Sequence, residues 1–98
     1  MVNQQTKRTL QQAHTTLPSA AVLAAAREFF ARHSGVYSAF LEKEGPTYIT
    51  LRGQGGEEIA IGVAEVAGAT AVTATSYIFD QQVARFLASL PVADAVVA

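Results

Sequence analysis

Cysteine is absent from the 98-residue sequence, and charged residues are scarce. Without cysteine the chain has no disulfide bond, no thiolate ligand for a metal ion and no cysteine nucleophile. Charged residues make up 15% of the sequence, against about 25% in a typical soluble domain. Because 50% of the residues are apolar, the surface is left largely to alanine, threonine, serine and glutamine. Such a surface is compatible with a partner that covers part of it.

A basic patch and a long apolar run are missing as well. The seven Lys and Arg residues are scattered along the chain and are offset by eight Asp and Glu residues, which gives a net charge of −1. Nucleic-acid-binding domains usually carry a basic stripe, so we do not expect a nucleic acid as a partner. No apolar run approaches the roughly 20 residues of a transmembrane helix, so we expect no membrane span.

The first 27 residues resemble a secretion signal in one respect, since they contain basic residues, no acid and the apolar run AAVLAAA at 20–26. In a signal peptide the apolar stretch follows its basic start directly. Here a polar spacer and Pro18 separate the two, and the apolar run continues into an amphipathic helix. We therefore expect this segment to stay in the mature protein, and the protein to be cytoplasmic.

The length suits one small domain, and we expect residues 1–98 to form a single domain. Residues 1–16 are polar. They form either a flexible tail or, over 7–14, a first edge-type strand whose basic residues discourage pairing with other chains. The compact core is predicted over about 17–91, followed by a short apolar tail at 92–98.

Two amphipathic helices are predicted. The first covers 18–33, with Thr16 as its expected N-cap and Gly35 just after its end. The second begins near Asp80, also an expected N-cap, and ends at Pro91. Apolar side chains recur at helical spacing in both, and those expected in the core are Phe29, Phe30, Phe86, Leu87 and Leu90.

Four strand-like segments lie between the helices, and glycine-containing turns separate them. This pattern is typical of an antiparallel meander. The segments are 36–43, 47–52, 57–66 and 69–77. The predicted fold is therefore α+β: a two-layer sandwich in which a four- or five-stranded antiparallel sheet packs against two helices, in the order (β)-α-β-β-β-β-α. The strand residues expected to face the helices are Ile49, Leu51, Ile59, Ile61, Val63 and Val72. Glu65 shares their side by strict alternation and is expected in solvent at the strand's end.

The segments TLPSAAVLAAAREFFARHSG and YIFDQQVARFLASLP, with four strands between them, resemble small bacterial proteins of the TATA-binding-protein-like and compact START-like kind. The resemblance covers most of residues 7–91 and is architectural, with the same β-α-β4-α order. A START-like fold implies an apolar ligand held between sheet and helices. The TATA-binding resemblance implies no DNA function, because a basic sheet face is absent.

The most conspicuous motif is RGQGGEE at 52–58. A dinucleotide-binding fingerprint needs three glycines as G-x-G-x-x-G, between a strand and a helix. Glu58 occupies the place of the third glycine, and the residues that follow alternate as a strand does. The motif therefore predicts a hairpin connection between two strands.

No residue stands out as catalytic, and no cofactor or metal is expected. His14 and His33 lie far apart in the sequence, without the three clustered ligands that a metal ion requires. The acid pairs Glu42/Glu44 and Glu57/Glu58 adjoin turns, where solvated charges are usual. We therefore expect a protein that is not an enzyme.

The remaining candidate is the side of the sheet away from the helices. It is expected to be flat, rich in small residues and weakly charged, and its candidate binding residues are Tyr48, Thr50, Arg52, Thr73, Thr75 and Tyr77. Tyr and Arg amid few other charges are typical of interface centres. The function we predict is a non-enzymatic interaction module, either self-associating or a small accessory subunit of a larger protein assembly. The alternative is a small carrier of an apolar ligand in a compact START-like fold.

Overall fold

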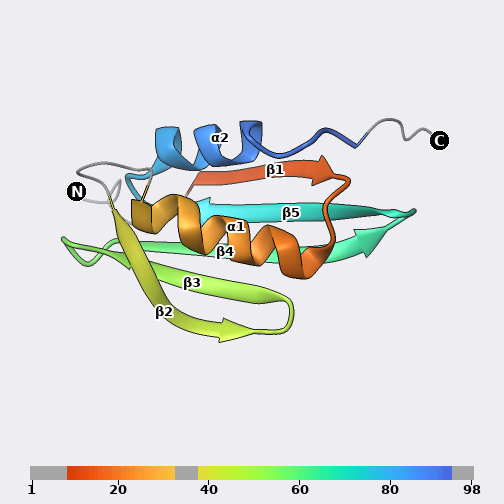
Figure 1. The fold of residues 1–98 in the computed structure, drawn as a ribbon. Helices are drawn as coiled ribbons and strands as arrows, with labels where there is room; N and C mark the ends of the chain where they lie inside the picture. The colour runs from red at the N-terminus through yellow and green to blue at the C-terminus, as the bar shows by residue number, and fades with distance from the viewer. Residues whose placement is uncertain (1–8, 33–37, 94–98) are drawn as a thin grey trace.

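The computed structural model describes residues 9–32 and 38–93. It contains five strands and two helices, in the predicted order β-α-β-β-β-β-α (Figure 1). The elements are β1 (Thr9–Thr15), α1 (Ser19–Arg32), β2 (Ala39–Gly45), β3 (Tyr48–Gly53), β4 (Glu58–Val66), β5 (Ala69–Ser76) and α2 (Asp80–Ala88). The α+β class and the antiparallel sheet are thereby confirmed. Among the described residues, neither helix is long and apolar enough to cross a membrane.

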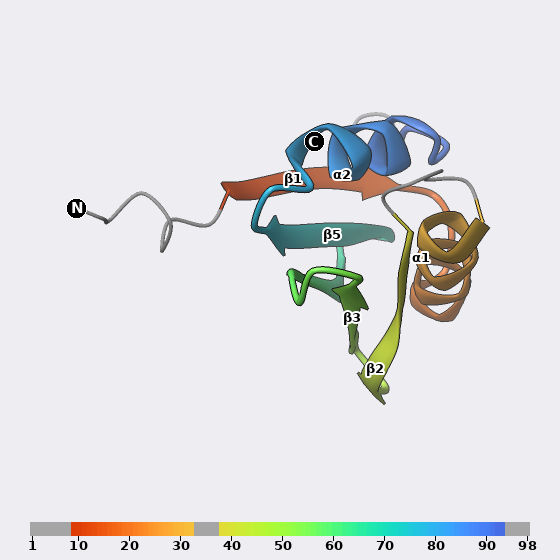
Figure 2. The same cartoon turned by 90° about the vertical axis from the view of Figure 1, so that its left-hand side faces the viewer.

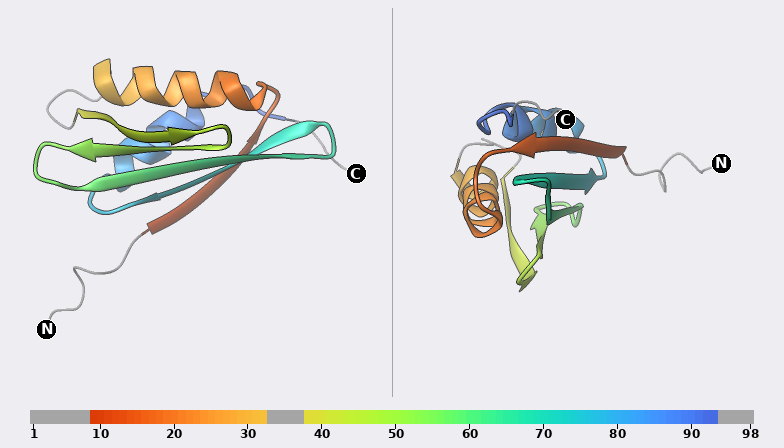
Figure 3. Two further views of the ribbon diagram at one scale, coloured as in Figure 1. Left: turned by 90° about the horizontal axis from the view of Figure 1, so that it is seen from below. Right: turned by 90° about the vertical axis from the view of Figure 1, so that its right-hand side faces the viewer.

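The strands form one antiparallel sheet in the order β1-β5-β4-β3-β2. Strands β2 to β5 make the predicted meander, and β1 adds to β5 through a regular ladder from Thr9↔Ser76 to Thr15↔Thr70. Of the two alternatives for the N-terminal segment, an edge strand over Thr9–Thr15 is therefore the correct one. Because β1 and β2 lie at opposite edges, α1 crosses one face of the sheet to connect them (Figures 1 and 3).

The glycines at two hairpin connections have the positive φ angles that tight turns require. In the RGQGGEE segment, Gly56 has φ +92°, and the Gly53 N–H donates to the Glu57 carbonyl at 2.7 Å. This segment links β3 to β4, as predicted. In the β4–β5 turn, Ala67 and Gly68 have φ values of 53° and 82°, the pair of positive angles that defines a type I′ hairpin.

Several predicted boundaries were wrong by a few residues, and both N-caps were misplaced. Helix α1 begins at Ser19, and its first hydrogen bond runs from the Val22 N–H to the Pro18 carbonyl at 3.0 Å, so Thr16 is not the cap. Asp80 lies inside α2, and its carboxylate accepts hydrogen bonds from the hydroxyls of Thr9 at 3.0 Å and Ser76 at 3.3 Å. The carboxylate thus ties the helix to the sheet. The expected end of the first helix at His33 and Gly35 lies outside the described residues.

The core lies between the sheet and the two helices, and the predicted core residues are confirmed. Ile49, Leu51, Ile59, Ile61 and Val72 are at most 2% exposed. Against them pack three aromatic rings, those of Phe29, Phe30 and Phe86, with centroids 5.1 to 5.7 Å apart. This is the spacing of favourable edge-on and tilted ring pairs, worth about 0.5–1.5 kcal/mol each beyond the area that they bury.

Both helices cover the same face of the sheet. Helix α1 packs over β2, β3 and β4, while α2 lies along β1 and β5 (Figure 1). Seen from the side, the sheet is strongly twisted (Figure 2), as antiparallel sheets generally are. The opposite face carries neither helix, so within residues 9–32 and 38–93 no helix covers that side of the sheet.

Candidate functional site

We call the helix-free side of the sheet the open face and define it by the ladder register, because residues opposite each other on neighbouring strands point to the same side. Core residues alternate along each strand with the residues of this face. Its described members are Leu10, Gln12, His14, Phe40, Lys43, Gly45, Tyr48, Thr50, Arg52, Glu58, Ala60, Gly62, Ala64, Val66, Ala69, Ala71, Thr73 and Thr75.

The structure brings five of the six sequence-predicted binding residues onto the open face. Tyr48 and Thr73 flank Gly62 in one cross-strand row, and Thr50 and Thr75 flank Ala60 in the next. Arg52 pairs with Glu58 in a third row. The sixth, Tyr77, follows the last residue of β5 and is half-buried in the bend before α2, so it is outside the ladder.

The middle of the open face is low and uncharged. Strands β4 and β5 contribute only alanine, glycine and threonine there. Around Gly62 the surface forms a shallow hollow of about 370 Å³, which Tyr48, Ala64, Ala71 and Thr73 help to line. Small side chains allow another backbone to approach the sheet closely at this point.

Larger apolar side chains stand around this floor. Leu10 on β1, Phe40 on β2 and Tyr48 on β3 are 58%, 53% and 42% exposed. Sequence reasoning identified Tyr48 and missed the other two. Leu10 was missed because its segment was predicted to be either an edge strand or a flexible tail, and in that case no face of the sheet could be assigned to its side chains. Phe40 was missed because no side was assigned to the residues of its strand, although it alternates with the buried Ala39 and the half-buried Leu41.

The side chain of Tyr48 is held on one side of the hollow. Its ring occupies the space that a Cβ atom at Gly45 would need, so a larger residue at position 45 would displace the ring. Gly62, which also pairs with Tyr48, has no such cover: a Cβ atom added there would have the Thr47 carbonyl oxygen, at 3.8 Å, as its nearest neighbour. The ring therefore leans away from Gly62 and leaves the hollow open.

The charged groups of the open face gather at its β2–β3 corner. The bulge of β2 places Glu42 beside Arg52, whose guanidinium donates to both carboxylate oxygens at 2.8 and 3.0 Å and to the Gly56 carbonyl at 2.8 Å. The hydrogen bond to Glu42 raises the pKa of Arg52 above its ordinary value. Lys43 and Glu58 add one more charge of each sign, so the corner carries two positive and two negative groups.

One polar atom beneath this surface is unpaired. The Thr50 hydroxyl oxygen is buried and makes no hydrogen bond within the described part of the chain. A buried unpaired hydroxyl costs about 1–3 kcal/mol. Thr50 lies between Tyr48 and Arg52 on β3, among the candidate binding residues.

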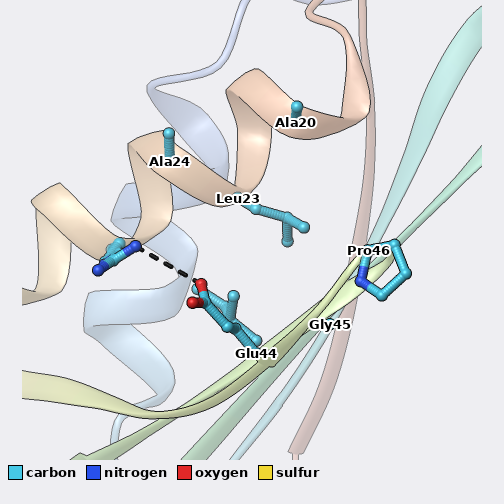
Figure 4. Close-up of a pocket in the computed structure, with 8 residues that line it drawn as sticks. Ala20, Leu23, Ala24, Glu44, Gly45 and Pro46 are labelled. Atoms are coloured by element: carbon cyan, nitrogen blue, oxygen red, sulfur yellow. Dashed lines mark ion pairs between the residues drawn. The ribbon is translucent and has the colours of Figure 1, made fainter.

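The other candidate groups do not converge on a site. Glu44 forms an ion pair with Arg27 at 3.6 Å beside an open groove between α1 and the β2–β3 turn, lined by Ala20, Leu23 and neighbouring residues (Figure 4). Glu57 accepts a hydrogen bond from the Gly55 N–H at 3.1 Å and so stabilises its own loop. Across residues 9–32 and 38–93 no three His, Asp or Glu side chains form a group that could hold a metal ion.

No protein-family model, no curated protein and no solved structure matches this chain. The resemblance to TATA-binding-protein-like and compact START-like proteins therefore stays a prediction. Any inference about function has to come from the geometry of the open face.

Proposed function

We propose that this chain is a non-enzymatic interaction module that binds another protein surface through its open face. The observation that carries the proposal is the combination of an uncharged floor with exposed Leu10, Phe40 and Tyr48 around it, on a sheet face that neither helix covers. Depletion of charge at the centre and enrichment in aromatic residues distinguish protein interfaces from the remaining surface. The partner is either a second copy or a subunit of a larger assembly.

An ordinary solvated sheet face is the competing explanation. In such a face the outward positions alternate with the core positions as polar and charged residues. On β4 and β5 the outward positions from Ala60 to Ala64 and from Ala71 to Thr75 carry no charge and little polarity. Such a surface offers few groups for hydrogen bonds with water. Few hydrogen bonds are therefore lost when another protein covers it, and this favours a protein contact.

The carrier alternative has no observation in its favour. A ligand site of this kind is an enclosed cavity of roughly 300 Å³ or more. The groove beside α1 and the hollow over Gly62 both open to solvent. The carrier therefore remains a prediction from the resemblance alone, and we do not propose it.

Site-specific crosslinking tests the proposal. A photo-crosslinking amino acid at position 73, in the floor, should form covalent adducts with a protein in cells of the source organism. The matched control is the same amino acid at position 24, which is exposed on α1. Adducts from position 73 should be lost when Gly62→Lys is added. Equal adducts from both positions, or none from position 73, would refute the proposal.

We place the protein in the cytoplasm as part of the same proposal. Intact-mass measurement of the protein purified from its native host should then show the first 27 residues still attached. A mature form that begins after the AAVLAAA run would show that the segment is a secretion signal and would overturn the cytoplasmic assignment.

A further inference from the structure

We infer that the partner of the open face is a second copy of this chain, packed face to face across a two-fold axis, with the floor around Gly62 near its centre. The inference rests on the proposed function and specifies the partner. It is carried by the glycine itself, the two sheet edges, the size of the face and its charge balance.

The fold of the single chain does not require glycine at position 62. Gly62 is in the interior of the central strand β4, its φ is not positive, and its ladder partners Tyr48 and Thr73 are in unbroken register. A Cβ atom there would meet nothing closer than 3.8 Å. Glycine in a strand interior is destabilising and otherwise marks a bulge, a bend or close approach by another molecule. The unbroken register excludes a bulge, and the open hollow over Gly62 favours close approach from outside as the reason for glycine here.

Neither edge of the sheet is suited to strand addition, so the face is the surface available to another copy. The β2 edge carries a register shift and the charged run from Glu42 to Glu44, two features that block edge pairing. The β1 edge is occupied at its end, where Val92 bridges to Thr15 and the Ala93 N–H donates to the His14 carbonyl at 3.2 Å. Helix α2 lies along the rest of β1 (Figure 1).

The open face is large enough for a dimer. Five strands spaced by about 4.8 Å give a width of about 24 Å, and seven residues at about 3.3 Å each give a length of about 23 Å. Two such faces bury about 1,100 Å² in total, slightly above the roughly 1,000 Å² that a biological interface needs. An area near this lower limit is typical of a weak or transient association.

Charge and shape fit the face to itself. The corner charges cancel, because Lys43 and Arg52 oppose Glu42 and Glu58, so two copies meet without net repulsion. A strongly acidic or basic partner would find no matching charge on the floor. With the axis beside the hollow, the exposed ring of Tyr48 from each copy can enter the hollow over Gly62 of the other, so a two-fold axis uses one patch twice.

Sedimentation velocity on the full chain, from about 1 to about 500 µM, tests the inference over the concentrations at which a weak dimer forms and dissociates. We expect a concentration-dependent species of twice the 10.3 kDa chain mass. Gly62→Lys and Thr73→Arg each place a charge on the floor and should weaken association at least tenfold. Ala24→Arg, which adds the same charge on the exposed side of α1, should leave it unchanged.

A second measurement uses the wild-type chain alone, so its result does not depend on whether the variants fold. Amide chemical shifts followed on dilution of the wild-type chain should change on β3, β4 and β5 around Gly62 and stay constant on α1. A chain that is monomeric throughout, a dimer unaffected by both floor variants, or dilution shifts confined to the helices would each overturn the inference. A monomer whose position 73 still crosslinks to a different protein in cells would overturn the inference and leave the proposed function standing.

Discussion

Replacing Gly62 by threonine should stabilise the folded monomer. The nearest heavy atom to a Cβ at this position is 3.8 Å away, an ordinary van der Waals contact, so no strain is introduced. Removing glycine from a strand interior gains about 0.5–1 kcal/mol relative to alanine, and threonine is preferred over alanine in strands. We expect a gain of about 1 kcal/mol, which raises the melting temperature by about 4–8 °C in a domain of this size.

Gly68→Ala is the matched control. A Cβ atom has room at both positions, and the two glycines differ in their backbone conformation. A Cβ at Gly68 also meets nothing within 4 Å, but φ is +82°. A residue with a Cβ loses about 1–2 kcal/mol in this left-handed region. Gly68→Ala should therefore lower the melting temperature while Gly62→Thr raises it.

Thermal and urea unfolding followed by far-ultraviolet circular dichroism measures both changes. The protein should be dilute enough to be monomeric, since association adds apparent stability by mass action. A loss of stability in Gly62→Thr would show that the monomer itself needs glycine at this position. That result would remove the main support for close approach by a second copy.

Four further substitutions test other parts of the structure by the same unfolding measurements. Ala67→Asn should gain about 0.5–1 kcal/mol, because asparagine tolerates the left-handed φ of 53° better than alanine does; a loss would contradict the type I′ turn. Phe86→Ala should cost about 3–5 kcal/mol, since it empties the centre of the aromatic cluster, and a loss below about 1 kcal/mol would mean that the rings do not pack as described. Thr70→Val should cost about 1–3 kcal/mol, because the Leu17 carbonyl loses the buried hydroxyl that donates to it at 2.6 Å; an unchanged midpoint would place this carbonyl in contact with water. Arg52→Ala should leave the unfolding midpoint unchanged, because exposed ion pairs contribute little, and a clear shift would show that its pair with Glu42 is structural.

Most of the core and much of the open face could be predicted, because both follow from alternation along single strands. Ile49 and Leu51 point one way and Tyr48 and Thr50 the other, whatever the neighbouring strands are. Glu65 was correctly expected in solvent at the end of its strand, although β4 is still paired there through Glu65↔Thr70. Phe40 obeys the same rule, but Glu42 and Lys43 could not be placed in this way, because the bulge after Leu41 depends on pairing with β3 and leaves no local signal.

The sequence by itself determined the local structure of this protein. Apolar residues at helical spacing specify α1 and α2, period-two patterning specifies the strands, and glycine at Gly56 and Gly68 permits the turns. These patterns depend on residues close together in the chain, so a short window of sequence is enough to predict them.

Only the tertiary structure decided which surfaces remain uncovered. Strand β1 pairs with β5 across more than fifty residues of chain, α2 fastens to it through Asp80, and both helices therefore lie on one face. The ring of Tyr48 lies over Gly45 and leaves Gly62 bare. The pairing of β1 and the placement of the helices depend on contacts between distant residues. Two glycines that look alike in the sequence therefore differ in the folded chain: the ring of Tyr48 lies over Gly45, while Gly62 leaves space for a second molecule.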